Sequence, residues 1–252
     1  MATNNQSNKA VLITGGSRGV GRATALLLAS GGYDVAINHR DSKAQAEETA
    51  AAIEALGVKA VIVQGDTSDD EACRAMVADA LAELGRLDVL VNNAATTKFI
   101  PHEQLDAVST ELWDRIFAVN VRGPFQCARA AQEALGASGN GQIINIASIA
   151  GICGNGSSIP YCASKAALIS LTQSLARTLA PKIRVNAIAP GPTDTEATRQ
   201  VPAELLDHVV NCLALKRLGR GCDGRMLENR LRSVILQPSR VGSFEQGLQR
   251  SL

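Results

Sequence analysis

The chain has 252 residues, of which 46% are hydrophobic and 19% charged, enough to bury the core of one large α/β domain. Its formal net charge of +1 gives no reason to expect nucleic acid or an anionic membrane as a partner. The polar N-terminus lacks the apolar segment of a signal peptide, and no apolar run approaches the roughly 20 residues of a membrane span, so we expect a cytoplasmic protein.

Short apolar segments alternate with longer helical patterns along most of the chain. Continuous β-branched character, as in AVLIT, is typical of buried strands. The predicted strands cover residues 10–14, 33–38, 59–65, 87–94, 141–148 and 183–190. The predicted helices cover about residues 20–30, 42–56, 68–85, 110–136 and 160–180. This alternation predicts a Rossmann-type doubly wound α/β fold, in which helices cover both faces of one parallel sheet.

The composition changes near the C-terminus. Alanine occurs 39 times in residues 1–214 and not once in residues 215–252, which marks a shift in the character of the chain. We therefore expect a single folded domain over residues 1–220 and an atypical tail of unknown structure over residues 221–252.

The cysteines form no CxxC pair and no metal-ligand spacing. We expect reduced, mostly packed thiols and no metal site. The six positions are Cys73, Cys127, Cys153, Cys162, Cys212 and Cys222.

The sequence TGGSRGVG, residues 14–21, directly follows the first strand and opens a helix. Glycines here permit a tight turn, a close approach of the backbone and close packing of helix on strand. The helix N-terminus then offers free N–H groups to a pyrophosphate. We predict a dinucleotide-binding turn, against the alternative of a purely structural one. Its cofactor-facing residues would be Gly15, Ser17, Arg18, Gly19, Val20 and Gly21.

The end of the second strand bears on the choice of cofactor. An acidic residue there usually holds the ribose 2′-hydroxyl of NAD, but this chain has Asn38, His39 and Arg40. Arg40 and Arg18 are both placed to meet a 2′-phosphate, whose geometry suits guanidinium. We therefore predict NADP(H) in preference to NAD(H). The alternative is that both arginines are merely solvated.

The sequence GDTSD follows the third strand. Asp66 could accept a hydrogen bond from the adenine amino group, and the Thr67 backbone could frame the ring. The alternative is a helix cap made by Ser68 or Thr67, and both functions can hold together.

The sequence NNAA, residues 92–95, follows the fourth strand. Two adjacent asparagines are costly in a buried strand unless they are hydrogen-bonded. We predict that Asn93, Ala94 and Ala95 face the cofactor, against the alternative of a simple polar turn.

Four polar side chains suggest catalysis. Tyr161 and Lys165 share one helix face at i and i+4. A phenol has a pKa of about 10, and a nearby ammonium group favours the phenolate, so we expect Lys165 to lower the pKa of Tyr161. Ser148 at the end of the fifth strand could hold a substrate carbonyl, while Asn120 is a poor residue for mid-helix unless its side chain has a role.

These features resemble the short-chain dehydrogenase/reductase family. The glycine motif has the family's TGxxxGxG form, and Asn120, Ser148, Tyr161 and Lys165 match its catalytic tetrad in order and spacing. Ala95 departs from the family's NNAG motif, because it replaces the glycine. The turn after the sixth strand matches the family's PGxxxT pattern, which implies cofactor contacts from Pro190, Gly191, Thr193 and Thr195.

The resemblance covers about residues 1–220 and is closest to 3-oxoacyl-[acyl-carrier-protein] reductases. It implies NADP(H)-dependent reduction of a ketone, with Tyr161 as proton donor and Lys165 also binding the nicotinamide ribose. The substrate would be a small carbonyl compound, such as a 3-oxoacyl thioester on acyl carrier protein or coenzyme A. It also implies a substrate lid over residues 196–213 and a homo-oligomer if the tail permits. The alternatives are an alcohol or sugar dehydrogenase of the same family and a non-catalytic dinucleotide-binding protein.

Overall fold

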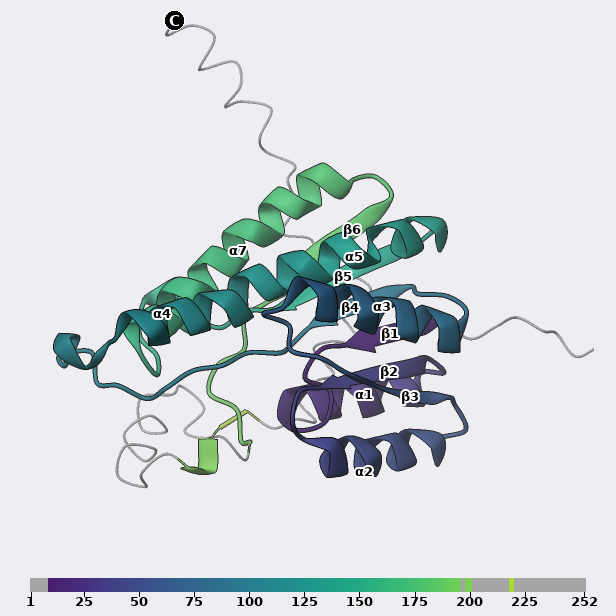
Figure 1. Cartoon of the computed structure of the whole chain (residues 1–252), viewed down its shortest axis with the longest axis horizontal. Coiled ribbons are helices and arrows are strands. Elements are labelled where there is room, and N and C mark those ends of the chain that lie inside the picture. The colour runs from purple at the N-terminus through teal and green to yellow at the C-terminus, as the bar shows by residue number, and fades with distance from the viewer. Residues whose placement is uncertain (1–8, 196–197, 201–217, 220–252) are drawn as a thin grey trace, which may run out of the picture.

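The structure, a computed structural model of the chain, describes residues 9–195, 198–200 and 218–219. Six strands form one sheet in the order β3-β2-β1-β4-β5-β6, and every neighbouring pair is parallel (Figure 1). The strand order reverses between β1 and β4, which is where open α/β sheets bind ligands. The strands are β1 (Ala10–Ile13), β2 (Asp34–His39), β3 (Ala60–Gln64), β4 (Val89–Asn92), β5 (Gly141–Ile146) and β6 (Ile183–Ile188).

Helices cover both faces of the sheet, as the doubly wound pattern predicts. One core cluster joins the sheet to α3, α5 and α7, and a second joins it to α1 and α2 (Figure 1). Alternate residues of β1 serve the two faces: Leu12 belongs to the first cluster, and Val11 and Ile13 to the second. These helices are α1 (Gly19–Ser30), α2 (Lys43–Glu54), α3 (Asp70–Leu84), α5 (Gly123–Ala137) and α7 (Ile159–Leu179).

The long helix predicted over residues 110–136 is divided in the structure. It consists of α4 (Thr110–Phe117), a π-helical segment η2 (Ala118–Arg122) and α5. Ser109 caps α4, because its hydroxyl accepts a hydrogen bond from the Leu112 backbone N–H. The π-helical segment carries Asn120, one of the four predicted catalytic residues, and such segments often occur at functional sites.

The start of α3 also differs from the prediction. The cap is Asp69, whose carboxylate accepts a 2.8 Å hydrogen bond from the Ala72 backbone N–H. Ser68 is not available for capping, because its hydroxyl donates to Asp66 instead. The short helix α6 (Ala150–Cys153) was not predicted.

The predicted tail, residues 221–252, lies outside the described residues. Of the lid predicted over residues 196–213, the structure describes Thr198–Gln200, which form one 3₁₀ turn. Within the described ranges, no helix has both the length and the apolar character needed to cross a membrane.

Candidate active site

The turn after β1 requires its glycines. Gly15 and Gly19 have φ angles of 62° and 56°, in the left-handed region that favours glycine. Gly21 has an ordinary φ, but a Cβ atom there would lie 2.1 Å from the Gly15 carbonyl oxygen. The turn therefore folds back so tightly on the first residues of α1 that a side chain at residue 21 cannot be accommodated.

Thr14 joins this turn to the segment after β4. Its hydroxyl accepts 3.0 Å hydrogen bonds from the backbone N–H groups of Asn93 and Ala94. The Asn93 side chain donates in return to the carbonyl oxygens of Thr14 and Gly15, both at 3.0 Å. Sequence reasoning missed Thr14, although a hydroxyl at the end of an otherwise apolar strand was a usable signal. Of the other residues predicted here, Ala94 takes part in this junction through its backbone N–H group, and Ala95 follows it and is exposed.

Asn38 is only 2% exposed and makes its hydrogen bonds within the protein. Its side-chain oxygen accepts a hydrogen bond from the Gly15 backbone N–H at 3.1 Å. Its side-chain NH₂ group donates to the Gly65 carbonyl oxygen at 3.0 Å. It thus ties the glycine turn to the end of β3. The neighbouring His39 is also buried, and its Nδ1 has no hydrogen-bond partner in the part of the chain that the structure describes.

The two arginines proposed for a 2′-phosphate differ in their surroundings. Arg18 is exposed, and no ion pair to it occurs within the described ranges. The guanidinium of Arg40 donates to the Asp41 carboxylate at 2.5 Å and lies 3.9 Å from Asp66. The hydrogen bond with Asp41 is the largest cause of a raised Arg40 pKa. Ser17 is buried next to Arg18, and its hydroxyl lies 2.7 Å from that of Ser42.

Asp66 is held in place by its own loop and by α4. One carboxylate oxygen accepts from the Ser68 hydroxyl and backbone N–H, and the other accepts from Arg115 at 2.8 Å. Burial raises the pKa of Asp66, but the hydrogen bonds from Ser68 and Arg115 outweigh it, so this pKa is lowered overall. Thr67, the other residue predicted here, is 5% exposed. Its carbonyl oxygen would lie 2.8 Å from a Cβ atom at Gly123, so the loop sits tightly on the start of α5.

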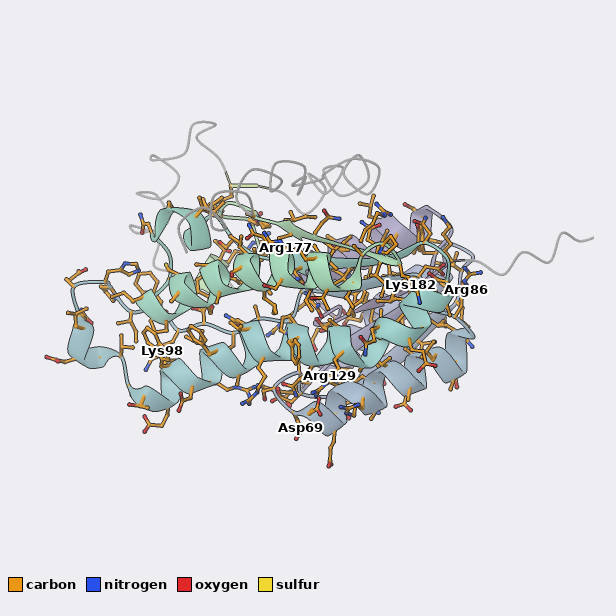
Figure 2. All side chains as sticks on the ribbon, turned by 90° about the horizontal axis from the view of Figure 1, so that it is seen from above. Asp69, Arg86, Lys98, Arg129, Arg177 and Lys182 are labelled. Carbon is orange, nitrogen blue, oxygen red and sulfur yellow. The ribbon has the colours of Figure 1, made fainter. Side chains whose placement is uncertain are left out.

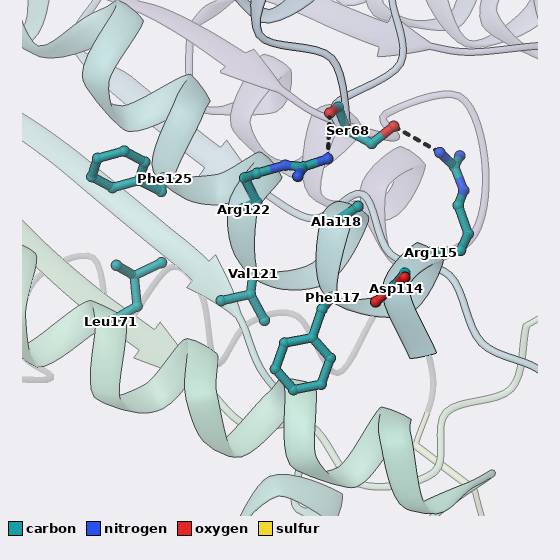
Figure 3. Close-up of a pocket in the computed structure, with 9 residues that line it drawn as sticks. All are labelled: Ser68, Asp114, Arg115, Phe117, Ala118, Val121, Arg122, Phe125 and Leu171. Atoms are coloured by element: carbon teal, nitrogen blue, oxygen red, sulfur yellow. Dashed lines mark hydrogen bonds between the residues drawn. The ribbon is translucent and has the colours of Figure 1, made fainter. Parts of the chain in front are cut away.

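A groove of about 890 Å³ lies beyond this loop (Figure 3). In its wall, Arg115 donates to the Ser68 hydroxyl at 2.7 Å and Arg122 donates to the Ser68 carbonyl oxygen at 3.2 Å. Apolar side chains from α4, η2, α5 and α7 complete the lining: Phe117, Ala118, Val121, Phe125 and Leu171. None of the four predicted catalytic residues lines this groove, so it is separate from the predicted catalytic centre.

The predicted catalytic residues come from three elements. Tyr161 and Lys165 lie on α7, Ser148 lies two residues beyond the end of β5, and Asn120 lies in η2. The Lys165 ammonium group is 5.7 Å from the centre of the Tyr161 ring and donates to the Ile146 carbonyl oxygen at 2.7 Å. Lys165 is 2% exposed, and burial lowers its pKa to about 8.

The pKa of Tyr161 corrects one expectation. Burial raises this pKa, a hydrogen bond with Ser148 lowers it, and the net shift is upward. The expected lowering is therefore wrong, because burial is the largest effect on the Tyr161 phenol; the Lys165 ammonium group donates to the Ile146 carbonyl oxygen. The Tyr161 phenol is therefore held in its protonated form at neutral pH. The Ser148 hydroxyl also accepts from the Ala150 backbone N–H at 3.1 Å, which fixes its position at the start of α6.

Asn120 connects the segment after β4 to α7. Its side-chain oxygen accepts a hydrogen bond from the Thr96 backbone N–H at 2.8 Å, and its side-chain NH₂ group donates to the Thr96 carbonyl oxygen at 3.0 Å. The same amide donates to the Ser164 hydroxyl at 3.0 Å, which in turn donates to the Tyr161 carbonyl oxygen at 2.8 Å. Ser164 is fully buried and was missed by sequence reasoning, although it directly precedes Lys165. This network fixes where the first turn of α7 presents Tyr161.

The turn after β6 returns to the glycine turn. Pro190 accepts a 3.0 Å hydrogen bond from the Ile149 backbone N–H, and the hydroxyl of Thr193 donates to the carbonyl oxygen of Gly191. A Cβ atom at Gly19 would meet nothing within 3.7 Å, and its nearest neighbour would be the Thr195 side chain. Gly19 thus brings the glycine turn, at the N-terminus of α1, close to Thr195 in the turn after β6. Within the described ranges, no group of three or more His, Cys, Asp or Glu side chains could hold a metal.

Comparisons with known proteins agree with this geometry. A protein named ketoacyl reductase 2 of the granaticin polyketide synthase, from Streptomyces violaceoruber, is 41% identical over 222 residues, 87% of this chain and 88% of that protein. A 3-oxoacyl-[acyl-carrier-protein] reductase from Staphylococcus aureus is 38% identical over 216 residues, 85% of this chain and 87% of that protein. The crystal structure of an NAD⁺-bound xylitol dehydrogenase superposes with a TM-score of 0.82 at 28% identity, covering 91% of this chain and 94% of the other.

The family model described as short chain dehydrogenase matches residues 9–205. Together with the glycine turn and the six-stranded parallel sheet, this match shows that the chain belongs to the short-chain dehydrogenase/reductase family of oxidoreductases, which bind a nicotinamide dinucleotide.

Proposed function

We propose that the chain is an NADP(H)-dependent reductase that converts a ketone into a secondary alcohol. The observation that carries this proposal is the grouping of a half-buried phenol, a serine hydroxyl and a buried ammonium group where β5 meets α7. Such a grouping can protonate a carbonyl oxygen. The glycine turn that would hold the cofactor follows β1, which only β4 separates from β5 in the parallel sheet, so both sets of residues lie at the carboxyl edge of the strands.

The cofactor would be held by the turn and by basic side chains. Gly15, Gly19 and Gly21 allow the backbone of the turn and the N-terminus of α1 to approach the pyrophosphate. Arg18 has no partner within the described ranges and suits the 2′-phosphate of NADP(H). When bound, NADPH supplies the hydride that reaches the carbonyl carbon.

Tyr161 acts as the proton donor to the carbonyl oxygen. Its raised pKa keeps the phenol protonated at neutral pH, so the proton is present when the oxygen becomes basic. Ser148, which is hydrogen-bonded to the phenol, holds the same oxygen in place. Lys165, with a pKa of about 8, can return a proton to the site near neutral pH. Asn120 holds α7 and the segment after β4 in register for this transfer.

The proposed substrate is a 3-oxoacyl thioester carried by acyl carrier protein or coenzyme A. Two relatives of this chain are named as ketoacyl or 3-oxoacyl reductases. Exposed apolar side chains next to Ser148, namely Ile149 and Ile152, offer a surface for an acyl chain. We further propose a cytoplasmic homo-oligomer, which size-exclusion chromatography with light scattering would test.

The function is tested by following NADPH consumption with acetoacetyl thioesters and simple diketones, and NADH consumption with the same compounds. We expect turnover of the thioesters with NADPH and weaker turnover with NADH. If the protein binds NADPH but reduces no member of the carbonyl panel, the non-catalytic dinucleotide-binding alternative gains support and the proposed activity is wrong.

The second candidate is an NAD-dependent alcohol or sugar dehydrogenase. Arg40 is already paired with Asp41, so its guanidinium is less available to a 2′-phosphate. In addition, one structural neighbour is an NAD⁺-bound xylitol dehydrogenase. Oxidation of a polyol panel with NAD⁺ at a higher kcat/KM than any ketone reduction would favour this candidate.

A further inference from the structure

Two cysteine thiols face each other between α3 and α5, away from the catalytic residues. Cys73 on α3 and Cys127 on α5 are both fully buried, and their sulfur atoms are 3.5 Å apart. The two helices pack side by side on one face of the sheet (Figure 2), where Arg129 of α5 forms an ion pair with Asp70 at the start of α3. The thiol pair therefore lies within a closely fitted interface.

The thiols form a hydrogen-bonded chain that ends at the predicted adenine loop. Cys127 donates to the sulfur of Cys73, and Cys73 donates to the Thr67 carbonyl oxygen at 3.4 Å. The same carbonyl oxygen packs against Gly123, where an added Cβ atom would approach to 2.8 Å. The thiol pair is thus hydrogen-bonded to the backbone of the loop after β3.

The two thiols are also unequal. The hydrogen bond from Cys127 lowers the pKa of Cys73, and this effect outweighs burial and the charges of Asp70, Asp69 and Asp66, which raise it. The hydrogen bond with Cys73 and burial both raise the pKa of Cys127. The hydrogen bond donated by Cys127 thus favours the thiolate form of Cys73 over that of Cys127.

We propose that Cys73 and Cys127 are a redox-modification site, at which a small hydroperoxide closes a disulfide between α3 and α5 and thereby weakens cofactor binding. The effect on the cofactor rests on the proposed function, whereas formation of the disulfide does not. The two sulfur atoms, now 3.5 Å apart, would have to approach to a bond of about 2.05 Å.

The chemistry with hydrogen peroxide balances in two steps. The Cys73 thiolate attacks one peroxide oxygen, the O–O bond breaks, and one water leaves as Cys73 becomes a sulfenic acid. The Cys127 sulfur then attacks the Cys73 sulfur, the S–O bond breaks, and a second water leaves. Two thiols are oxidised by two electrons, and one peroxide is reduced to two waters. Cys73 then has no S–H to donate to the Thr67 carbonyl oxygen.

The disulfide is tested by mass spectrometry on the full chain. The folded protein is treated with hydrogen peroxide, unfolded in the presence of an alkylating reagent, and digested with trypsin without reduction. Cleavage after Lys59, Arg74, Arg122 and Arg129 gives peptides 60–74 and 123–129, each with a single cysteine. We expect these peptides to appear cross-linked, and to separate after treatment with dithiothreitol. Recovery of both peptides alkylated, or oxidised without a cross-link, would overturn the proposal.

The effect on the cofactor is tested by NADPH fluorescence titration of the same samples. Because one weak hydrogen bond to the loop is lost, we expect the NADPH Kd to rise by about threefold or more, and to recover with dithiothreitol. Cys127→Ala, which keeps Cys73, should show no such rise after peroxide treatment. If that variant does not fold, recovery of the wild-type protein with dithiothreitol serves as the control.

The outcomes separate the two proposals. A cross-linked protein whose NADPH Kd is unchanged would overturn the coupling to the cofactor. A reduced protein that binds neither NADPH nor NADH would instead contradict the proposed function, while the cross-link between peptides 60–74 and 123–129 would still establish the modification site.

Discussion

The catalytic residues and the arginines near the end of β2 differ in how the protein holds them. Lys165 and Asn120 are buried, and each is fixed by hydrogen bonds to the backbone of another element. Arg18 and Arg40 are exposed, and the one ion-pair network among them joins Arg40 to Asp41 and Asp66. In the proposed function, the residues that support Tyr161 and Ser148 would thus be fixed within the core, whereas the cofactor would be selected by side chains at the surface.

This difference predicts how the two regions respond to substitution. A change among the buried groups removes transition-state interactions or leaves a buried polar partner unsatisfied, and both are costly. A change at an exposed guanidinium removes an interaction that water screens. Substitutions in the first region should therefore affect kcat and stability, and those in the second should affect only the KM for the cofactor.

Apart from a change at Tyr161 itself, the largest of these effects is expected for Ser148→Ala. Losing the hydroxyl that holds the carbonyl oxygen should lower kcat by about 10²–10³-fold with little change in the NADPH KM. Steady-state kinetics with an acetoacetyl thioester would measure this change. Ser138→Ala is the matched control and should leave kcat unchanged, because the Ser138 hydroxyl bonds only locally at the end of α5, donating to the Leu135 carbonyl oxygen and accepting from the Asn140 backbone N–H. Equal kcat values in the two variants would remove Ser148 from the site.

Gly21→Ala should break the cofactor turn. Its methyl group would meet the Gly15 carbonyl oxygen at 2.1 Å, so we expect a loss of about 1–3 kcal/mol in the free energy of unfolding, together with loss of NADPH binding. Urea unfolding and fluorescence titration measure the two effects. The matched control is Gly136→Ala in α5, where a Cβ atom meets nothing within 4 Å, so stability should hold or rise slightly. A Gly21→Ala protein as stable as Gly136→Ala would contradict this description of the turn.

The burial of Lys165 should appear in the pH dependence of stability. Its pKa is about 8 in the folded chain, against 10.5 as its ordinary value, so between these values the unfolded chain binds more protons. Stability should consequently rise with pH in this window, by about 1–2 kcal/mol from pH 8 to 9.5 relative to Lys165→Met. Chemical unfolding of both proteins across this range would measure the difference. A stability difference between the two proteins that stays constant or falls with pH would show that burial does not lower the pKa of Lys165 in the folded chain.

The smallest effects concern the exposed arginines. Arg18→Ala should raise the NADPH KM by about tenfold, because no ion pair within the described ranges competes with the 2′-phosphate for the Arg18 guanidinium. Arg40→Ala should raise it by only about threefold, because Arg40 is already engaged by Asp41. The NADH KM serves as the internal control and should change in neither variant. An equal rise in the KM for NADPH and NADH would mean that these arginines do not bind the 2′-phosphate that distinguishes the two cofactors.

The fold could be predicted because the sequence repeats one simple pattern. Each strand is a short apolar run and each helix has a boundary signal, such as the Gly85 that ends α3 in the left-handed conformation. The π-helical segment could not be predicted in this way. Its Asn120 hydrogen-bonds to the backbone of Thr96, 24 residues earlier, and no local pattern encodes that partner.

The candidate site was predictable in its residue types but not in all of their contacts. The spacing of Tyr161 and Lys165 correctly predicted a shared face of α7, but the sign of the Tyr161 pKa shift depends on burial against other elements. The contacts of Asn38 could not be predicted from the sequence either, because its hydrogen-bond partners Gly15 and Gly65 lie more than twenty residues before and after it. Thr14 and Ser164 were missed because each has a partner far along the chain, the backbone of Asn93 and Ala94 for Thr14 and the Asn120 side chain for Ser164.

The most direct test of the central claim, that Tyr161 is the proton donor of a carbonyl reductase, is the kcat of Tyr161→Phe with NADPH and an acetoacetyl thioester. Phenylalanine keeps the ring on α7 and removes only the phenolic hydroxyl. We expect kcat to fall by about 10²–10⁴-fold, while the NADPH Kd stays within about twofold of the wild-type value. A Tyr161→Phe protein that reduces the thioester at the wild-type rate would contradict the account.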